Sequence, residues 1–253
     1  RRFVTILDEL CSELPLLRTS ARQGSERPRG AVAQRMFAAV EPYCEDCFIT
    51  PMAAVAGSVA EAILESMTEA ATLERAYVNN GGDIAIHLAD SCGYKIGMVE
   101  RPDRPSLFGS LEISTADPVR GIATSGWRGR SFSLGIADAV TVLADCASAA
   151  DAAATVIGNA VNLPDHPGIS RIPARGISPD SDLGDFLVTR GVEPLSCSEI
   201  FAALDSGVRE ADALRAQGLI HSSALCLQGY TRVVSPLLAQ ASIESSPRSL
   251  LHA

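Results

Sequence analysis

The stretch IATSGWRGRSFSLGIADAVTVLADCASAADAAATVIGNAV, residues 122–161, contains the strongest local signals for how this chain folds. Two β-branched segments, at 121–124 and 140–144, flank a loop of glycines, hydroxyl residues and two arginines, and are expected to be strands. An alanine-rich segment with Asp151 as its single acid follows, and we expect a helix there with Ser148 as its cap. Because a loop of small residues lets a ligand approach the main chain, a functional site is expected within this stretch.

Alternation and helical periodicity predict further elements on both sides of this stretch. Further short strands are expected at residues 76–78, 84–88, 94–99 and 111–115, and a hairpin over 219–227 and 230–234. Helices are expected over residues 1–17, 31–40, 50–67 and 196–216. Thr50-Pro51 marks a helix start, and Ser196 with Glu199 forms a capping box. This order favours an α+β fold over strict βαβ repetition, in one large domain or two tightly joined halves.

The composition limits the classes of partner. The 253 residues are 47% hydrophobic and 20% charged, as expected of a soluble globular protein. A net charge of −9 and a pI of about 4.9 argue against nonspecific binding to nucleic acid or to anionic membranes. No apolar run approaches the roughly 20 residues of a membrane span. We therefore expect a cytoplasmic protein whose ligand, if anionic, needs a locally basic or metal-assisted pocket.

The seven cysteines are an odd number without the spacing of a disulfide framework, so reduced thiols are expected. Cys44 and Cys47 form a single CxxC pair. Without a second pair, a structural zinc site is not expected. The two acids between them should raise the pKa of both thiols and weaken their nucleophilicity, so a redox or cluster role is the minor alternative.

Residues 79–83, NNGGD, have two interpretations. Asn-Gly between two alternating segments is the strongest local signal for a type I′ hairpin turn. The second interpretation is that the glycine pair forms a cradle in which a ligand contacts the main chain. Local sequence favours the hairpin.

The loop at residues 123–133 collects four hydroxyl residues, two arginines and the single tryptophan of the chain. Successive amide groups around glycine can bind an anion, and arginine grips phosphate in a bidentate fork. The alternative is an exposed loop with solvated arginines. The Walker spacing and its lysine are absent, so this is not a P-loop.

Asp151 and Thr155 lie one helical turn apart and are expected to share a face. Carboxylate and hydroxyl oxygens suit Mg²⁺, with waters and ligand phosphates completing the shell. The alternative is structural, because Ser148-x-x-Asp151 also fits a capping box. Local physical chemistry alone favours the cap.

Four motifs follow one another along the chain: NNGGD at 79–83, ATSG at 123–126, VTVLA at 140–144 and ADAAAT at 150–155. In order and approximate spacing they resemble the ApbE superfamily of flavin-handling proteins. Longer stretches, such as TPMAAVAGSVAEAIL and YVNNGGDIAIHL, are closer to one branch, the uncharacterised ApbE-like, thiamine-biosynthesis-related family of anaerobic bacteria and archaea. The resemblance runs from about Thr50 to Val161, and more loosely to Val234.

The resemblance implies a fold and a set of ligands. The fold is a single α+β domain of the ApbE-like, T-fold-related kind, an antiparallel sheet layered with helices. It would occupy residues 31–235, after an N-terminal helix and flexible connection at 1–30 and before a weakly structured tail at 236–253. In ApbE an Asp and a Thr bind Mg²⁺, and they correspond to Asp151 and Thr155. Contacts with FAD or FMN are implied for Asn80, Gly81, Gly82, Asp83, Thr124, Ser125, Gly126 and Ser131.

The activity implied by the resemblance is transfer of FMN from FAD to a threonine of a target protein. Mg²⁺ fits that reaction because it neutralises the pyrophosphate that is cleaved. We therefore expect an enzyme or binding protein for a flavin or similar nucleotide with Mg²⁺; for an FMN transferase the catalytic residues would be Asp151, Arg128 and Asp138. Its partners would be a small phosphorylated nucleotide or flavin, a protein acceptor or redox partner, and a second copy of the chain in a homo-oligomer.

Two departures from the ApbE pattern favour a second hypothesis. Glu61 stands where the superfamily has a lysine, and the H-I-I-D-P-R-T-G element that follows A-T-S-G is missing. Arg128, Arg130, Ser131 and Asp138 stand in that region instead. The alternative is a noncatalytic accessory protein that binds a partner protein in sulfur or homocysteine metabolism, with which the branch is associated.

Overall fold

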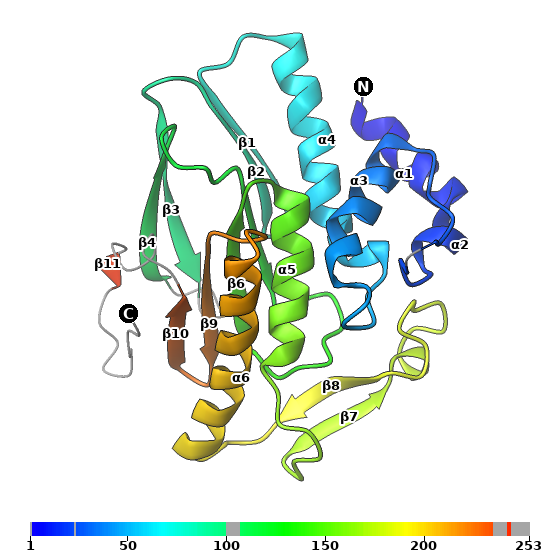
Figure 1. The fold of residues 1–253 in the computed structure, drawn as a ribbon, viewed down its shortest axis with the longest axis vertical. Coiled ribbons are helices and arrows are strands. Elements are labelled where there is room, and N and C mark those ends of the chain that lie inside the picture. The colour runs from blue at the N-terminus through cyan, green and yellow to red at the C-terminus, as the bar shows by residue number, and fades with distance from the viewer. Residues whose placement is uncertain (1, 23, 100–106, 235–241, 244–253) are drawn as a thin grey trace. The chain divides into compact units, whose positions relative to one another are not determined.

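The computed structural model describes residues 2–22, 24–99, 107–234 and 242–243 (Figure 1). Within these ranges the protein is mixed α+β, with mainly antiparallel strands and six α-helices. The α-helices are α1 (Arg2–Ser12), α2 (Leu14–Leu17), α3 (Ala31–Val40), α4 (Val55–Ala70), α5 (Ala147–Ala160) and α6 (Cys197–Ala216). The 3₁₀ helices are η1 (Glu41–Tyr43), η2 (Pro51–Ala54) and η3 (Ala174–Gly176). No helix in this part of the chain is long and apolar enough to cross a membrane.

The strands belong to three sheets. Their bounds are β1 (Arg75–Asn80), β2 (Asp83–Leu88), β3 (Gly93–Val99), β4 (Leu107–Ser114), β5 (Gly121–Ser125), β6 (Ala139–Ala144), β7 (Ile169–Pro173), β8 (Leu187–Val192), β9 (Ser222–Leu227), β10 (Tyr230–Val234) and β11 (Ser242–Ile243). The chain divides into two compact units. The first contains residues up to 93, 114–123 and 144–152, and the second contains 94–113, 124–143 and the residues from 153 onward. β3, β4, β5, β6 and α5 contribute residues to both units.

The first unit is built on the β1–β2 hairpin. Asn80 pairs with Asp83, so the two-residue loop is Gly81-Gly82, with φ angles of 75° and 118°. Only glycine adopts such angles readily, which is why this sequence turns here. β2 in turn pairs antiparallel with the start of β5. The hairpin predicted at NNGGD is thereby confirmed.

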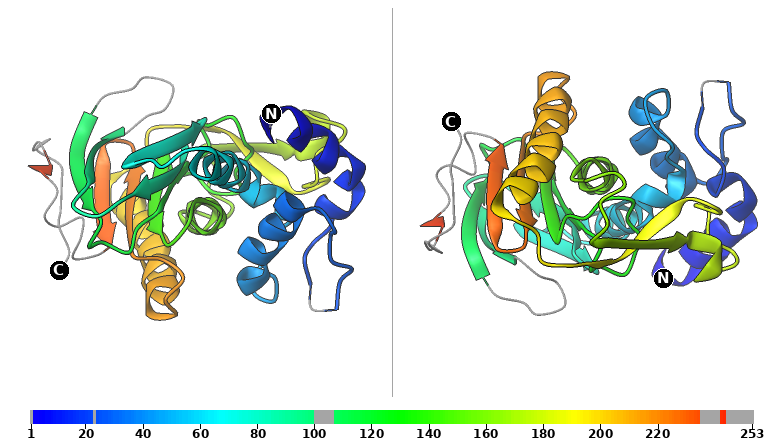
Figure 2. Two further views of the ribbon diagram at one scale, coloured as in Figure 1. Left: turned by 90° about the horizontal axis from the view of Figure 1, so that it is seen from above. Right: turned by 90° about the horizontal axis from the view of Figure 1, so that it is seen from below.

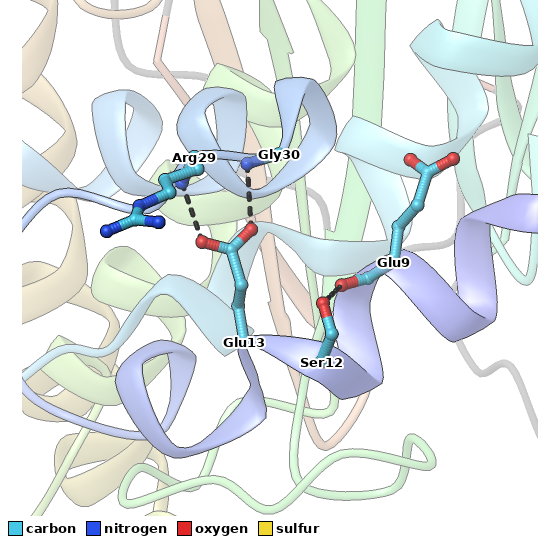
Figure 3. Close-up of a pocket in the computed structure, with 5 residues that line it drawn as sticks. All are labelled: Glu9, Ser12, Glu13, Arg29 and Gly30. Carbon is cyan, nitrogen blue, oxygen red and sulfur yellow. Dashed lines mark hydrogen bonds between the residues drawn. The ribbon is translucent and has the colours of Figure 1, made fainter.

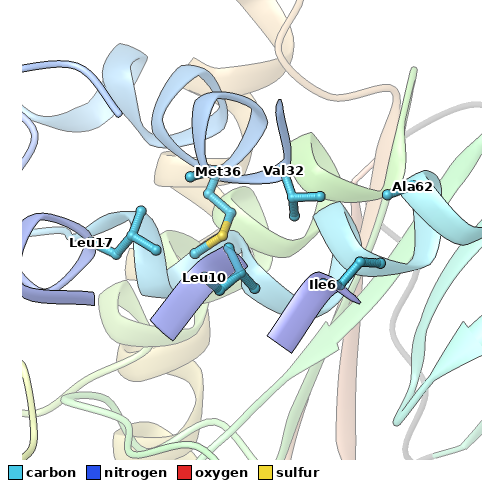
Figure 4. Close-up of a cluster of buried hydrophobic side chains, with 7 residues drawn as sticks. Ile6, Leu10, Leu17, Val32, Met36 and Ala62 are labelled. Atoms are coloured by element: carbon cyan, nitrogen blue, oxygen red, sulfur yellow. The ribbon is translucent and has the colours of Figure 1, made fainter. Parts of the chain in front are cut away.

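α4 has two apolar faces within this unit. One face packs on the sheet through Ala60 and Leu64, against Ala76 and Ala85. The other face contributes Ala62 to a cluster with α1, α2 and α3 (Figure 4). The buried side chains of that cluster are Ile6, Leu10, Leu17, Val32, Ala33, Met36 and Ala62. α4 is therefore held on both sides, which fixes the position of its N-terminus.

The second unit contains β9, β10 and all of β6 except Ala144, and these strands pair antiparallel. All six residues of β6 are buried, as are those of β9. α6 lies across β9 and β10, as the two views in Figure 2 show. A separate antiparallel pair, β7 and β8, lies between α5 and α6, where no strand was expected from the sequence, with a bulge between Ser170 and Arg171.

Helix boundaries differ from the sequence prediction at two places. Thr50 makes no side-chain capping hydrogen bond, and a 3₁₀ turn separates it from α4, which begins at Val55. Ser148 lies inside α5, which begins at Ala147, so it is not the cap of that helix. Both N-termini take their partners from distant residues instead. Most of the tail predicted at 236–253 lies outside the described residues.

The predicted capping box of α6 is confirmed. The Ser196 hydroxyl accepts a hydrogen bond from the Glu199 amide, and the Glu199 carboxylate accepts one from the Ser196 amide at 2.8 Å. His166 Nε2 lies 2.9 Å from the same carboxylate. The hydrogen bond from the Ser196 hydroxyl, followed by the contact with His166, lowers the pKa of Glu199 from its ordinary value to about 2.

This low pKa predicts an acid-dependent loss of stability. A carboxyl whose pKa is lower in the folded protein stabilises it above the unfolded-state pKa, and this stabilisation disappears as the pH falls toward the folded value. Glu199→Gln keeps the capping geometry but removes the titration. We expect wild type to be the more stable of the two at pH 6, with the difference shrinking by pH 3, as measured by urea unfolding. An equal difference at both pH values would contradict the assignment.

Candidate functional site

The candidate site lies where α4 begins. The first amide groups of a helix have no partner within it, and here they are met by a side chain from α5. Asp151 Oδ2 accepts a hydrogen bond from the Gly57 amide at 3.0 Å, and the Ala56 amide also donates to this carboxylate. Asp151 thus caps α4 and not its own helix. The local capping box with Ser148 is not what this carboxylate forms.

The N-terminus of α5 is capped in return by α4. Glu61 Oε1 accepts a hydrogen bond from the Ser148 amide at 2.5 Å, and Glu61 Oε2 lies 3.0 Å from Arg35 Nε. Each helix therefore supplies the carboxylate that caps the N-terminus of the other helix. Gly57 makes this approach possible, because a Cβ atom there would lie 2.3 Å from the Ala147 carbonyl oxygen. We refer to Gly57, Glu61, Ser148 and Asp151 as the reciprocal caps.

The NNGGD turn meets the same place. Asn80 Nδ2 donates to the Ala56 carbonyl at 3.2 Å, which ties the turn to the start of α4. Within the turn, the Gly82 amide donates to Asn79 Oδ1 at 2.9 Å. A Cβ atom at Gly82 would meet nothing within 4 Å, so the turn is open on that side. The hairpin and the cradle, which were alternatives from sequence, are compatible in this geometry.

Two carboxylates, those of Asp151 and Asp83, repel one another here. The pKa of Asp151 is raised well above its ordinary value, first by burial and second by the charge of Asp83, while the amides of Gly57 and Ala56 act in the opposite direction. A cation beside both carboxylates would relieve this repulsion. The donor set therefore suits a hard cation such as Mg²⁺. No group of three or more His, Cys, Asp or Glu side chains is placed to hold a metal in the described parts of the chain, so the remaining ligands would have to be other oxygens.

Thr155, the second predicted metal ligand, follows one turn later on α5 and so lies on the same face of the helix as Asp151. Thr155 belongs to the second unit. Ser125 lies over α5 in that unit, since a Cβ atom at Gly158 would be 3.8 Å from Ser125 Oγ. The hydroxyl of Thr124 makes a hydrogen bond of 2.9 Å with that of Thr141. The metal and flavin contacts of these residues stay predictions.

Two of the predicted catalytic residues pair with one another. Arg128 Nε lies 2.5 Å from Asp138 Oδ1, and the Gln228 amide donates to Asp138 Oδ2 at 2.6 Å. The Arg128 guanidinium also stacks 4.2 Å from the centre of the Trp127 ring. Asp138 is 3% exposed. This arrangement holds the loop to the β9–β10 turn, and neither charge is without a partner.

The rest of the 123–133 loop is more open. Arg130 and Ser131 are exposed, as the solvated-loop interpretation expects. Gly126 packs on the main chain of Asp138, because a Cβ atom there would lie 2.4 Å from its carbonyl oxygen. That glycine is therefore needed for packing, whatever else it contacts.

Two comparisons with known proteins bear on this site. A family model described as "AbpE bacteria" matches residues 1–233. The chain belongs to that family. Its relatives include a UPF0280 protein of Methanosarcina barkeri, 40% identical over 116 residues, which are 46% of this chain and 44% of the relative. The UPF0280 protein of Methanopyrus kandleri is 40% identical over 129 residues, 51% of this chain and 48% of the relative. The chain thus spans about half the length of the curated relatives it matches.

The reciprocal caps of this AbpE-family chain could not be predicted as a unit from the sequence. Gly57 and Ser58 are small residues that permit close packing, and Glu61 stands where the ApbE pattern has a lysine. Nothing local connects these positions with Asp151 or with the N-terminus of α5. The signal that was present, small residues in the first turns of a helix, indicates close approach without naming the partner.

Proposed function

We propose that this member of the AbpE bacteria family binds a flavin nucleotide, FAD or FMN, or a related small phosphorylated nucleotide, together with Mg²⁺. The observation that carries the proposal is the start of α4, where Asp151 accepts from the Gly57 amide and Asn80 ties the Gly81-Gly82 turn to the Ala56 carbonyl, with the charge of Asp83 acting on Asp151. The order of the motifs, which resembles that of the ApbE superfamily, is the reason for proposing a flavin as the ligand. The repulsion between the two carboxylates is the reason for proposing a bound cation.

Asp151 is the residue that would hold the metal, with the charge of Asp83 acting on it. A magnesium ion keeps several waters and commonly takes ligand phosphates into its shell. When bound, it would neutralise the charge of a pyrophosphate. Asn80 holds the turn in place, and the open side of Gly82 leaves room for a ligand beside the main chain.

A more specific proposal is that the protein transfers FMN to a protein acceptor. It would give Asp151 a role in metal binding and would draw Arg128 and Asp138 into catalysis. Those two side chains form an ion pair with each other, so a catalytic role would require substrate to compete for one of them. The transferase activity is therefore proposed with Asp151 as its principal residue.

One observation favours the second candidate, a noncatalytic accessory protein that binds a partner in sulfur or homocysteine metabolism. Glu61, which stands where ApbE has a lysine, is engaged by the Ser148 amide and by Arg35. Here this position serves packing between α4 and α5. A protein with this role would bind a partner protein and turn over no nucleotide.

The test is a titration of the purified chain with FAD and with FMN, each with and without Mg²⁺, followed by flavin fluorescence and by the melting temperature. A ligand present at about 100 times its Kd stabilises the folded state by about 2.7 kcal/mol, so binding should raise the melting temperature measurably. We expect this rise to depend on Mg²⁺. Absence of binding to any flavin below millimolar concentration would reject the flavin part.

Asp151→Asn and Asp83→Asn provide the matched variants, because each keeps a hydrogen-bond acceptor and removes one charge. We expect both to lose the Mg²⁺-dependent rise, and Asp151→Asn to be at least as stable as wild type without metal, since the charged form is disfavoured there. Asp90→Asn, an exposed acid at the other end of β2, should keep the Mg²⁺ response. An unchanged response in Asp151→Asn would reject the metal assignment.

A further inference from the structure

A second group of reactive side chains lies outside the candidate site, in the turn that follows α3. The 3₁₀ helix η1 (Glu41–Tyr43) leads into this turn. The Cys44 amide donates to the Glu41 carbonyl at 3.4 Å, and the Cys47 amide donates to the Tyr43 carbonyl at 3.0 Å. The segment therefore keeps a helical path through Cys47. Residues three apart on such a path lie on the same side.

Both thiols point back over this turn. Cys44 Sγ donates to the Glu41 carbonyl at 3.0 Å, and Cys47 Sγ donates to the Tyr43 carbonyl at 3.5 Å. Both cysteines are reduced; Cys44 is buried and Cys47 is exposed. No other two cysteines of the chain are so close in sequence. One turn thus presents an accessible thiol with a protected thiol behind it.

We propose that Cys44 and Cys47 form a dithiol site that reacts with small-molecule disulfides, of the class of glutathione disulfide, and closes to an intramolecular disulfide. The Cys47 thiolate attacks one sulfur of the disulfide, and the first small thiol leaves. Cys44 then loses its proton and attacks Cys47 Sγ, and the second small thiol leaves. Two protein thiols are oxidised and one disulfide is reduced to two thiols, so the exchange balances.

The geometry permits closure. A disulfide requires Cα atoms about 4.4–6.8 Å apart, and residues i and i+3 of a turn lie within about 7 Å. The environment also orders the two steps. Burial, and next the charge of Glu45, raises the pKa of the Cys44 thiol, so Cys44 is the poorer nucleophile toward a dissolved disulfide. Once Cys47 carries the mixed disulfide, proximity favours attack by Cys44.

The consequence for the protein is local. The turn ends three residues before Thr50, where η2 and then α4 begin. A disulfide here would remove both S–H donors from the carbonyls of Glu41 and Tyr43 and would fix the connection between α3 and α4. The proposal rests on other residues than the proposed flavin and Mg²⁺ binding, so either can fail without the other.

The experiment uses the full chain in buffers of glutathione and glutathione disulfide, followed by alkylation, trypsin digestion and mass spectrometry. No Lys or Arg lies between Met36 and Glu74, so one tryptic peptide, residues 36–75, carries Cys44 and Cys47 and no other cysteine. We expect this peptide to lose two hydrogen atoms and to resist alkylation. The internal disulfide should exceed the glutathione adduct on this peptide by at least about tenfold.

Two exposed cysteines serve as internal controls for the oxidant. Cys11 and Cys197 lie in tryptic peptides without a second cysteine, and should carry glutathione under the same conditions. Cys44→Ser should accumulate glutathione on Cys47, whereas Cys47→Ser should leave the buried Cys44 unmodified. The proposal is overturned if wild type accumulates glutathione on Cys47 with Cys44 alkylated. It is equally overturned if peptide 36–75 stays reduced while Cys11 and Cys197 react.

Discussion

Gly57→Ala is expected to destabilise the protein by about 3 kcal/mol, although alanine is normally the better helix former. The added Cβ atom would lie 2.3 Å from the Ala147 carbonyl oxygen and 2.8 Å from the Ser148 amide nitrogen. These are main-chain atoms at the start of α5, so the two helices would have to separate. Separation would also lengthen the hydrogen bonds to Asp151 and Glu61, which satisfy the helix ends. Urea unfolding of wild type and variant measures the difference.

Gly158→Ala is the matched control, because it places the same methyl group in the same kind of helix. Its nearest neighbour would be Ser125 Oγ at 3.8 Å, an ordinary contact. Without a clash, the lower conformational entropy of alanine in the unfolded chain should stabilise the protein by up to about 1 kcal/mol. Equal effects of the two substitutions would mean that the reciprocal caps do not require close contact at Gly57.

Asp138→Ala is the second substitution with a large expected effect, about 3 kcal/mol. Its carboxylate is buried and accepts hydrogen bonds from Arg128 and from the Gln228 amide. Removing it leaves a largely buried guanidinium and a main-chain donor without their partner, and an unpaired buried group costs more than the pair contributes. The midpoint of urea unfolding should therefore fall well below that of wild type.

Asp138→Asn separates the two parts of this loss. The amide oxygen can still accept from the Gln228 amide, so we expect a smaller cost than for alanine, with the charge of Arg128 alone uncompensated. Arg130→Ala removes an exposed arginine two residues along the loop and should change stability little. If Asp138→Ala leaves stability unchanged, the ion pair is not structural, and the predicted catalytic role of Asp138 gains support.

Several elements could be predicted because their causes lie within a few residues. The hairpin at NNGGD needs positive φ angles at two adjacent positions, and two glycines supply them. The capping box of α6 needs Ser196 and Glu199 three residues apart, and Gly218 after the helix has a φ of 76°. Such signals operate before any tertiary contact forms.

Other features could not be predicted because their causes are remote. No strand was expected between α5 and α6, yet β7 and β8 form there; their alternation is weak and their stability depends on pairing. Thr50 has the residue type and the following proline of a helix cap, yet the chain makes a 3₁₀ turn there and α4 begins later. In both cases tertiary packing overrode the local preference.

Asp151 shows most clearly which features the sequence determines and which the tertiary structure determines. Its residue type and its place on an alanine-rich helix indicated, from the sequence by itself, a carboxylate that needs a partner. Which partner it takes was decided by the fold, since Gly57 lies 94 positions away in sequence and Ser148 lies 87 positions from Glu61. The orphan amides at a helix start donate to whichever oxygen the packing brings near them. Local sequence therefore determined that these carboxylates would need hydrogen-bond donors. The packing of α4 on α5 determined which amides donate to them.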